Sequence, residues 1–171
     1  MTISILNTPT LWVNTYLQEK LQDFGIQRIP FFPSTPSTVN DITENVSSDG
    51  LMATYDRMIS LRRSPFPHIK TEQILYYFYA TSEDSVVNII KIVEGVQRLL
   101  DREDESAEEI NAWALSKNSI PIEGENIVRN YNFHNFKVYQ LQETRNIINF
   151  NSVATYDGAK IIIQYEYNSL L

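Results

Sequence analysis

The sequence predicts an α+β fold, in which a mainly antiparallel sheet of about four to five strands packs against a long N-terminal helix and a second long helix. Two long segments carry apolar residues at helical spacing, whereas the other regular segments are short and rich in β-branched and aromatic residues. Adjacent strands joined by short links usually pair antiparallel, and the helices are then expected to cover one face. The length of 171 residues suits a single domain spanning 1–171.

The first helix is expected at 9–24. Thr8 can cap it, and Pro9 fits the first turn because its missing N–H would be unpaired there. Apolar residues follow at helical spacing, and Gly25 stands where a left-handed C-terminal cap is needed. This segment therefore has a defined start, face and end.

The next part of the chain predicts three strands and one long loop. A short strand is expected at 26–32, and an irregular loop rich in Ser, Thr, Asn and Pro follows near 33–50. Segment 51–61 favours a strand, which the prolines of 64–67 must interrupt. Segment 72–81, EQILYYFYAT, is apolar or aromatic on both faces, which predicts a central strand covered on both sides.

The second long helix is expected at 84–101, after a capping signal at 81–84. Its apolar stripe is Val86, Ile89, Ile90, Val93, Val96 and Leu100. A short third helix should begin at Ser106 and present Ile110, Trp113 and Ala114 on one side.

The last third of the chain predicts two closing strands. Residues 116–132 are expected to be irregular, and strands are expected at 133–144 and 159–167. Turn residues at 156–158 should precede the final strand.

Composition excludes several classes of protein. The net charge of −7 opposes non-specific binding of nucleic acid, and the absence of cysteine excludes disulfides, a cysteine nucleophile and Cys-rich zinc sites. The longest apolar run, 74–80, is too short to span a bilayer, so no membrane partner is expected. The N-terminus lacks the basic start of a secretory signal, which favours a soluble protein made inside a cell.

No motif of an enzyme is present, so no catalytic residue, cofactor or metal is expected. The five glycines are isolated from one another, which excludes a phosphate-binding loop and a dinucleotide fingerprint. His68 and His134 lack partners at metal-ligand spacing, and each is interpreted as a hydrogen-bonded structural residue.

The acidic run 101–109 is the most tempting chemical feature. Clustered carboxylates can hold Mg²⁺ or Ca²⁺, and the enzymatic alternative is a metal site made by Asp101, Glu103 and Asp104. The run lacks the glycine that a calcium loop needs at its turn. It is therefore interpreted as a solvated link whose acids favour the positive N-terminal end of the third helix.

Surfaces suited to protein partners remain. The aromatic run 76–79 has no interleaved Lys or Arg, which favours a buried strand with phenol tips at an interface over a base-stacking platform. Arginines and aromatic residues near proline-rich loops are typical of interface hot spots. The candidate interface residues are Phe31, Phe32, Arg57, Arg62, Arg63, Phe66, Asp101, Glu103 and Asp104.

The order of these elements resembles that of the tail terminator proteins of tailed bacteriophages. The resemblance spans nearly the whole chain, and its most suggestive local piece is SPFPHIKTEQILYYFYATSED, which enters the strong strand and then the second helix. The chain departs from the family in an extra acidic segment with a short helix at 102–115 and in the irregular passage near 116–132. These insertions leave open a related neck or head-to-tail connector role.

The resemblance implies a structural virion protein of the tail-neck region, assembled in the host cytoplasm. Family members form a ring, typically a hexamer, that caps the tail tube, joins it to the neck proteins and lets DNA pass through as a passenger. Acidic walls suit such a passage because they repel phosphates. In the ring, Arg57, Arg62 and Arg63 are expected to form salt bridges to acids of the 101–104 segment. The alternative is a neck or connector adaptor, or a small protein-binding domain, that forms no terminator ring.

Overall fold

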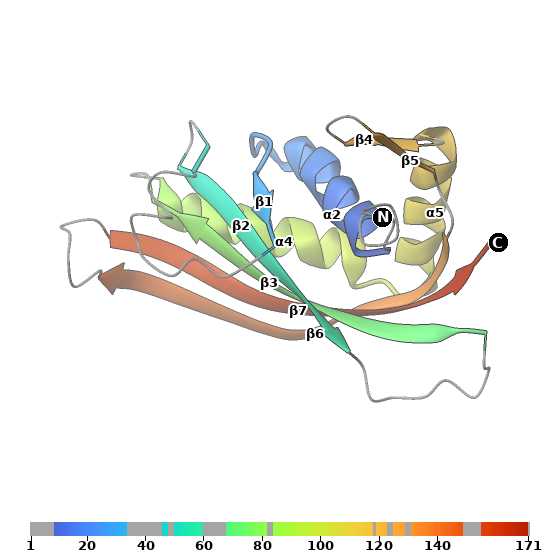
Figure 1. Cartoon of the computed structure of the whole chain (residues 1–171). Helices are drawn as coiled ribbons and strands as arrows, with labels where there is room; N and C mark the ends of the chain where they lie inside the picture. The colour runs from blue at the N-terminus through green and yellow to red at the C-terminus, as the bar shows by residue number, and fades with distance from the viewer. Residues whose placement is uncertain are drawn as a thin grey trace.

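The computed structural model describes residues 9–33, 46–47, 50–59, 68–81, 84–117, 119–122, 125–128, 131–148 and 155–170. The fold is α+β, with the helices on one face of a five-stranded sheet (Figure 1). The described α-helices are α2 (Pro9–Lys20), α4 (Ser85–Leu100) and α5 (Asp104–Lys117). The sheet has the order β1-β2-β3-β7-β6, from β1 (Phe31–Phe32), β2 (Leu51–Ile59), β3 (Lys70–Ala80), β7 (Thr155–Ser169) and β6 (Tyr131–Ile148).

The sheet is mixed but mainly antiparallel. The pairs β2–β3, β3–β7 and β7–β6 are antiparallel, and only the two residues of β1 run parallel to β2. This arrangement agrees with the predicted mainly antiparallel sheet of four to five strands. The central position of β3 is also confirmed, since it pairs with a strand on each side.

The N-terminal helix follows the prediction closely. Helix α2 is extended by a 3₁₀ turn, η1 (Leu21–Phe24), so that helical structure covers 9–24. Gly25 has a φ of 77° in the left-handed region, and its N–H donates to the carbonyl of Gln22. Thr8, the expected N-terminal cap, lies outside the described residues.

The predicted strand at 26–32 is mostly wrong, because only β1 pairs with a neighbour. Ile26 and Ile29 are both buried, and a spacing of three residues does not fit the period of two along a strand. Pro30 cannot donate to a ladder, and its carbonyl instead accepts from the N–H of Ala53. The segment therefore fills the core below α2 as an irregular chain. Most of the expected 33–50 loop lies outside the described residues.

Helix α4 faces the sheet with a somewhat different stripe from the predicted one. Val86 and Ile90 are exposed, because the helix turns Ile92 and Leu99 into the core. The N-cap is Asp84, which makes no side-chain cap bond, and residues 82–83 of the expected signal lie outside the described part of the chain. Its buried residues are Ile89, Ile92, Val93, Gly95, Val96, Leu99 and Leu100.

The prediction for the last third of the chain needs three corrections. Helix α5 begins two residues before Ser106, although Ile110, Trp113 and Ala114 are buried as predicted. The passage 116–132 is not irregular: α5 continues to Lys117, and β4 (Ser119–Ile122) pairs with β5 (Glu125–Val128) in a separate two-stranded sheet. These strands are too short for alternation to be visible in the sequence.

The expected turn at 156–158 lies inside β7. Asp157 and Gly158 pair with Ala80 and Tyr79 of β3, and the Asp157 carboxylate accepts a hydrogen bond from Ser85 at the start of α4. A buried acid beside a helix N-terminus is favourable there. Tertiary contacts therefore extend a strand through residues that favour turns locally.

The two faces of β3 differ. Ile74, Tyr76 and Phe78 point to the helices and are fully buried, whereas Leu75 and Tyr77 on the opposite face are half-buried. On that opposite face Tyr79 is also buried, together with Met52 and Thr54 of β2 and Ile162 and Gln164 of β7. Strand β3 is therefore shielded on both sides, as predicted, although the described helices cover only one face. No described helix is long and apolar enough to cross a membrane.

Candidate interaction surfaces

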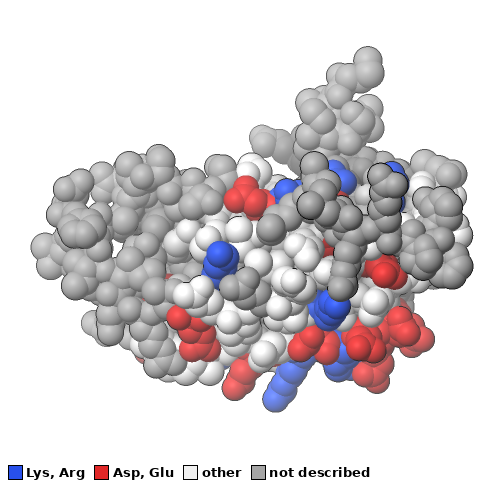
Figure 2. All heavy atoms as spheres, turned by 90° about the horizontal axis from the view of Figure 1, so that it is seen from below, with Lys and Arg blue, Asp and Glu red and all other residues white. Residues whose placement is uncertain are grey.

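The sheet face opposite the helices, called here the outer face, combines aromatic rings with amides. The rings of Tyr77 and Tyr79 stack with their centroids 6.3 Å apart, and the Nζ of Lys160 lies 5.8 Å from the Tyr77 ring centroid. Gln73 of β3 donates to Gln164 of β7 across 3.0 Å. Figure 2 shows mainly uncharged residues in the middle of the described surface on this side, with charged residues densest at the lower right and others at the top and left.

Arg57, a predicted interface residue, has a partner within the chain. Its Nε donates to Oε1 of Glu72, and the Tyr165 hydroxyl donates to Oε2 of the same carboxylate across 2.7 Å. The Glu72 side chain is 5% exposed and that of Arg57 is 46% exposed. Burial raises the pKa of Tyr165 well above its usual value. The cluster therefore holds a buried carboxylate with two donors, one of which reaches solvent.

Sequence reasoning missed Glu72 as the partner of Arg57. The signal was present, because Glu72 lies two residues before Ile74 and so falls on the helix-facing side of the strand. A charged residue on a buried strand face needs a partner.

The acids of the α4–α5 connection contact the edge of the sheet. The N–H of Glu103 donates to the carbonyl of Phe136 across 2.9 Å, and the N–H of Phe136 donates back across 3.2 Å. The Oδ1 of Asp101 accepts from the N–H of Val138 across 2.8 Å. Asp104 is exposed in the first turn of α5, where a negative charge meets the positive end of the helix, as predicted.

The structure does not bring Arg57 and these acids together. Arg57 lies on β2 and the acids lie beside β6, with β3 and β7 between them. A salt bridge from Arg57 to these acids would therefore join different copies of the chain. Arg62, Arg63 and Phe66 lie outside the described residues.

The two predicted aromatic residues of β1 lie on opposite faces of the sheet. Phe31 packs edge-on against Tyr76 and Phe78, with centroid distances of 5.8 and 5.9 Å, and is a partly buried residue at the margin of the main core. Phe32 packs on the outer face against a small cluster formed by Met52 and Tyr79. Only Phe32 is thus placed on the face that lacks a described helix.

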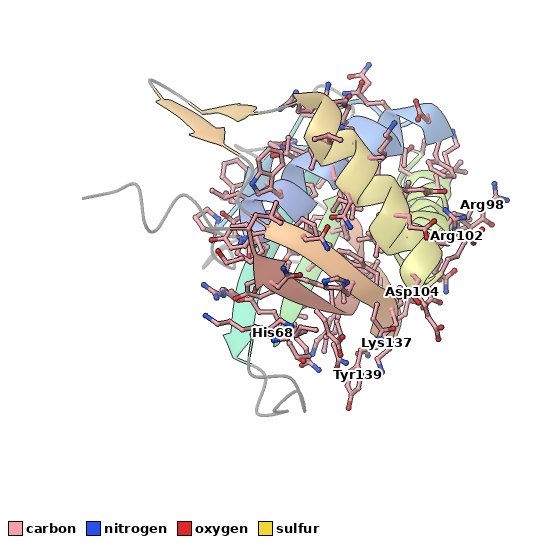
Figure 3. All side chains as sticks on the ribbon, turned by 90° about the vertical axis from the view of Figure 1, so that its right-hand side faces the viewer. His68, Arg98, Arg102, Asp104, Lys137 and Tyr139 are labelled. Carbon is pink, nitrogen blue, oxygen red and sulfur yellow. The ribbon has the colours of Figure 1, made fainter. Side chains whose placement is uncertain are left out.

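Two further apolar features are exposed and were not predicted as interface residues, although Val86 and Ile90 were assigned to the apolar stripe of the second helix. Val86, Val87 and Ile90 form a patch on α4, with exposed fractions of 37%, 50% and 38%. Tyr139 is 58% exposed at a β-bulge of β6, and Figure 3 shows it pointing away from the body beside Lys137.

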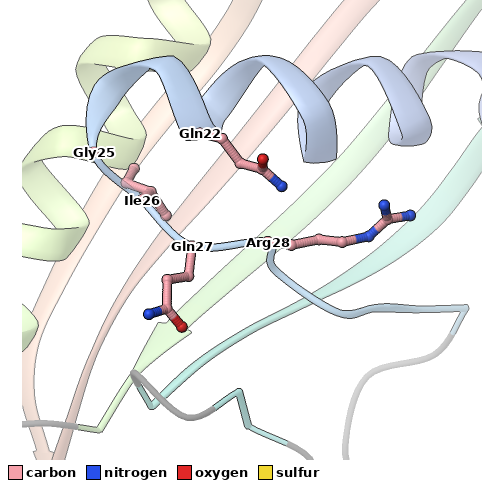
Figure 4. Close-up of a pocket in the computed structure, with 5 residues that line it drawn as sticks. All are labelled: Gln22, Gly25, Ile26, Gln27 and Arg28. Carbon is pink, nitrogen blue, oxygen red and sulfur yellow. The ribbon is translucent and has the colours of Figure 1, made fainter.

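The histidines and acids of the described residues form no metal-binding cluster. The Nε2 of His134 lies 2.6 Å from Oδ1 of Asn168, which confirms a hydrogen-bonded role, and His68 is exposed. No described group of three or more His, Cys, Asp and Glu side chains could hold a metal ion. A surface hollow of about 500 Å³ is lined by consecutive or neighbouring residues of one segment (Figure 4), namely Gln22, Gly25, Ile26, Gln27 and Arg28.

The chain matches no protein-family model, and no curated protein matches it by sequence.

Proposed function

We propose that this protein is a structural subunit of a tailed-phage virion that forms a ring capping the tail tube and joining it to the neck. The observation that carries the proposal is the placement of all described helices on one face of a mainly antiparallel sheet, as the element order predicts. The element order of helix, short strand, strand pair, long helix and two closing strands supports the resemblance to tail terminators, with α5, β4 and β5 inserted before the closing strands.

A ring of identical subunits needs two different surfaces on each subunit, because every contact is heterologous. The chain offers two exposed apolar candidates on separate layers: Tyr139, which projects from a bulge of β6, and the patch of Val86, Val87 and Ile90 on α4. Exposed apolar clusters of this kind favour protein contacts. The net charge of −7 is compatible with DNA as a passenger that does not bind the wall.

Particle composition tests the virion role. Antibodies against the purified chain are expected to label the head–tail junction of phage particles in immunoelectron microscopy. Label on the capsid or the distal tail, or absence of the protein from washed particles, would contradict the proposal. A control antibody against a capsid protein verifies that the particles are intact.

An adaptor that binds one partner without forming a ring is the second candidate, and the α4 patch favours it. The substitution Val87→Lys would then abolish capture of a single stoichiometric partner by a monomeric chain, whereas Leu115→Lys, at a more exposed apolar residue of α5, would not.

A further inference from the structure

The α4 patch of Val86, Val87 and Ile90 lies on the first turns of its helix, and its exposed fractions are 37%, 50% and 38%. Figure 1 shows these turns at the end of the helix layer opposite to α5, and η1 lies against α4 further along, at Gly95. All three residues are β-branched, which lowers helix propensity, so helix formation does not account for them at exposed positions. An exposed apolar cluster of this kind marks a contact surface.

Two oppositely charged side chains flank the α4 patch. Asp84 precedes the patch and is exposed, and Lys91 follows it and is half-buried. They are about two helical turns apart, so both lie on the same flank of the helix. Among the described residues, neither side chain takes part in a salt bridge, and Asp84 makes no side-chain cap bond. The patch therefore has an acid at one end and a base at the other.

This charge pattern makes the patch complementary to a second copy of itself. When two identical helices pack antiparallel about a two-fold axis, the start of one flank meets the end of the same flank on the other helix. The midpoint between Asp84 and Lys91 lies next to Val87, and so does the midpoint of the patch. An axis beside Val87 therefore places Val87 against its own copy and each Val86 near the partner's Ile90. The same axis places each Asp84 near the partner's Lys91.

The antiparallel direction has two further electrostatic advantages. It sets the two helix macrodipoles in opposite directions, and exposed Glu94, about one turn after Ile90, would lie near the N-terminal end of the partner's helix, where a negative charge is favourable. In a parallel pair, each charged side chain would instead lie level with its own copy, so no acid would face a base. The charges therefore favour one arrangement of the two helices.

We infer that the α4 patch joins two copies of this chain, with the two α4 helices antiparallel about a two-fold axis beside Val87. The inference goes beyond the proposed ring, because ring contacts are heterologous whereas this contact joins a surface to itself. The patch belongs to the helix layer, and Tyr139 of β6 remains exposed for contacts within a ring. A chain with both kinds of contact forms two rings joined face to face.

Cysteine cross-linking tests the two-fold axis, because the chain has no cysteine. We expect a short bifunctional maleimide to link Val87→Cys to its own copy, since the axis brings the two positions together. Leu115→Cys, at an exposed apolar residue of α5, is the matched control and should not link to itself. Equal linking of the two variants would show random collision and overturn the inference, as would the absence of linking at Val87→Cys.

Charge reversal, followed by sedimentation of the full chain, tests the flanking pairs. Asp84→Lys and Lys91→Glu should each weaken the dimer about tenfold, because each places like charges opposite one another. The double variant Asp84→Lys/Lys91→Glu exchanges the charges within each pair and should restore association to the wild-type level. A further loss in the double variant would overturn the pairing. Circular dichroism checks the fold, and Lys91→Glu leaves the N-cap unchanged, so it tests the pair even where Asp84→Lys unfolds the helix.

The outcomes separate this inference from the proposed ring. Rings in which Val87→Cys does not link to its own copy would overturn the two-fold contact and leave the ring intact. Dimers linked through Val87→Cys, with no larger species, would support the two-fold contact and contradict the ring. Monomers at every accessible concentration, including monomers that capture a different protein through the patch, would overturn both.

Discussion

Replacing Arg57 by Met is expected to destabilise the fold mainly through Glu72. Removing one partner of a fully buried ion pair costs about 3–5 kcal/mol, because the remaining charge is uncompensated. The Glu72 side chain is 5% exposed, but Arg57 is 46% exposed and the Tyr165 hydroxyl remains as a donor. Water can reach part of the vacated site, so we expect Arg57→Met to lower the free energy of unfolding by about 2–3 kcal/mol.

A double-mutant cycle measured by urea denaturation tests this reasoning. Glu72→Met should also destabilise, and it leaves the Tyr165 hydroxyl without its acceptor. The double variant Arg57→Met/Glu72→Met removes both charges, so it should lose only about 1–2 kcal/mol, less than the two single losses together. Additive single effects, or a wild-type midpoint for Arg57→Met, would refute the ion pair.

Three further predictions concern ionisation and the sheet edge. Burial opposes ionisation of Glu19, but hydrogen bonds from Lys117 and the Trp113 indole outweigh this effect and lower the pKa of Glu19 below 4.5. The ionised Glu19 therefore stabilises the fold above pH 4.5, and this stabilisation is lost as the pH falls through the folded pKa. Glu19→Gln should flatten the acid limb of the Tm–pH curve. Burial, and then the nearby Glu109 charge, raises the pKa of Tyr16 to about 12. The contribution of the neutral Tyr16 to folding stability is therefore complete below pH 10 and is lost as the pH rises through 12. A phenolate absorbance difference between wild type and Tyr16→Phe near pH 11 would contradict this. Asp101→Ala should lower the free energy of unfolding by about 1 kcal/mol and speed hydrogen exchange at the Val138 N–H, which donates to Asp101. Asp101→Asn keeps an acceptor oxygen and should retain most of the protection.

The elements with strong local signals were predictable from the sequence. The N-terminal helix has a proline at its start, an apolar stripe and a glycine with positive φ at its end, and helical structure covers 9–24. Strand β3 is a run of large apolar residues that only a sheet interior accommodates. In both segments, local preference and tertiary burial agree.

The errors fall where tertiary contacts override local preference. Asp157 and Gly158 are turn formers, yet β3 on one side and Ser85 on α4 hold them in a strand. Ile26 and Ile29 look like strand residues but are anchored separately in the core. Only the packed structure decides between these conformations.

The candidate site was less accessible to sequence reasoning than the fold. The partner of Arg57 required knowing which face of β3 is buried, and the contact of Glu103 with Phe136 joins residues that share no pattern. The strand order β1-β2-β3-β7-β6 could not be found at all, because in it β3 pairs with a strand about half the chain away. Long-range pairing of this kind leaves no local signature.

Electron microscopy of the purified full chain, with its mass in solution measured by light scattering, tests the central claim most directly. The proposed function predicts closed rings of about six copies around an open lumen. A single monomeric species over the whole accessible concentration range, with no ring in any image, would contradict it.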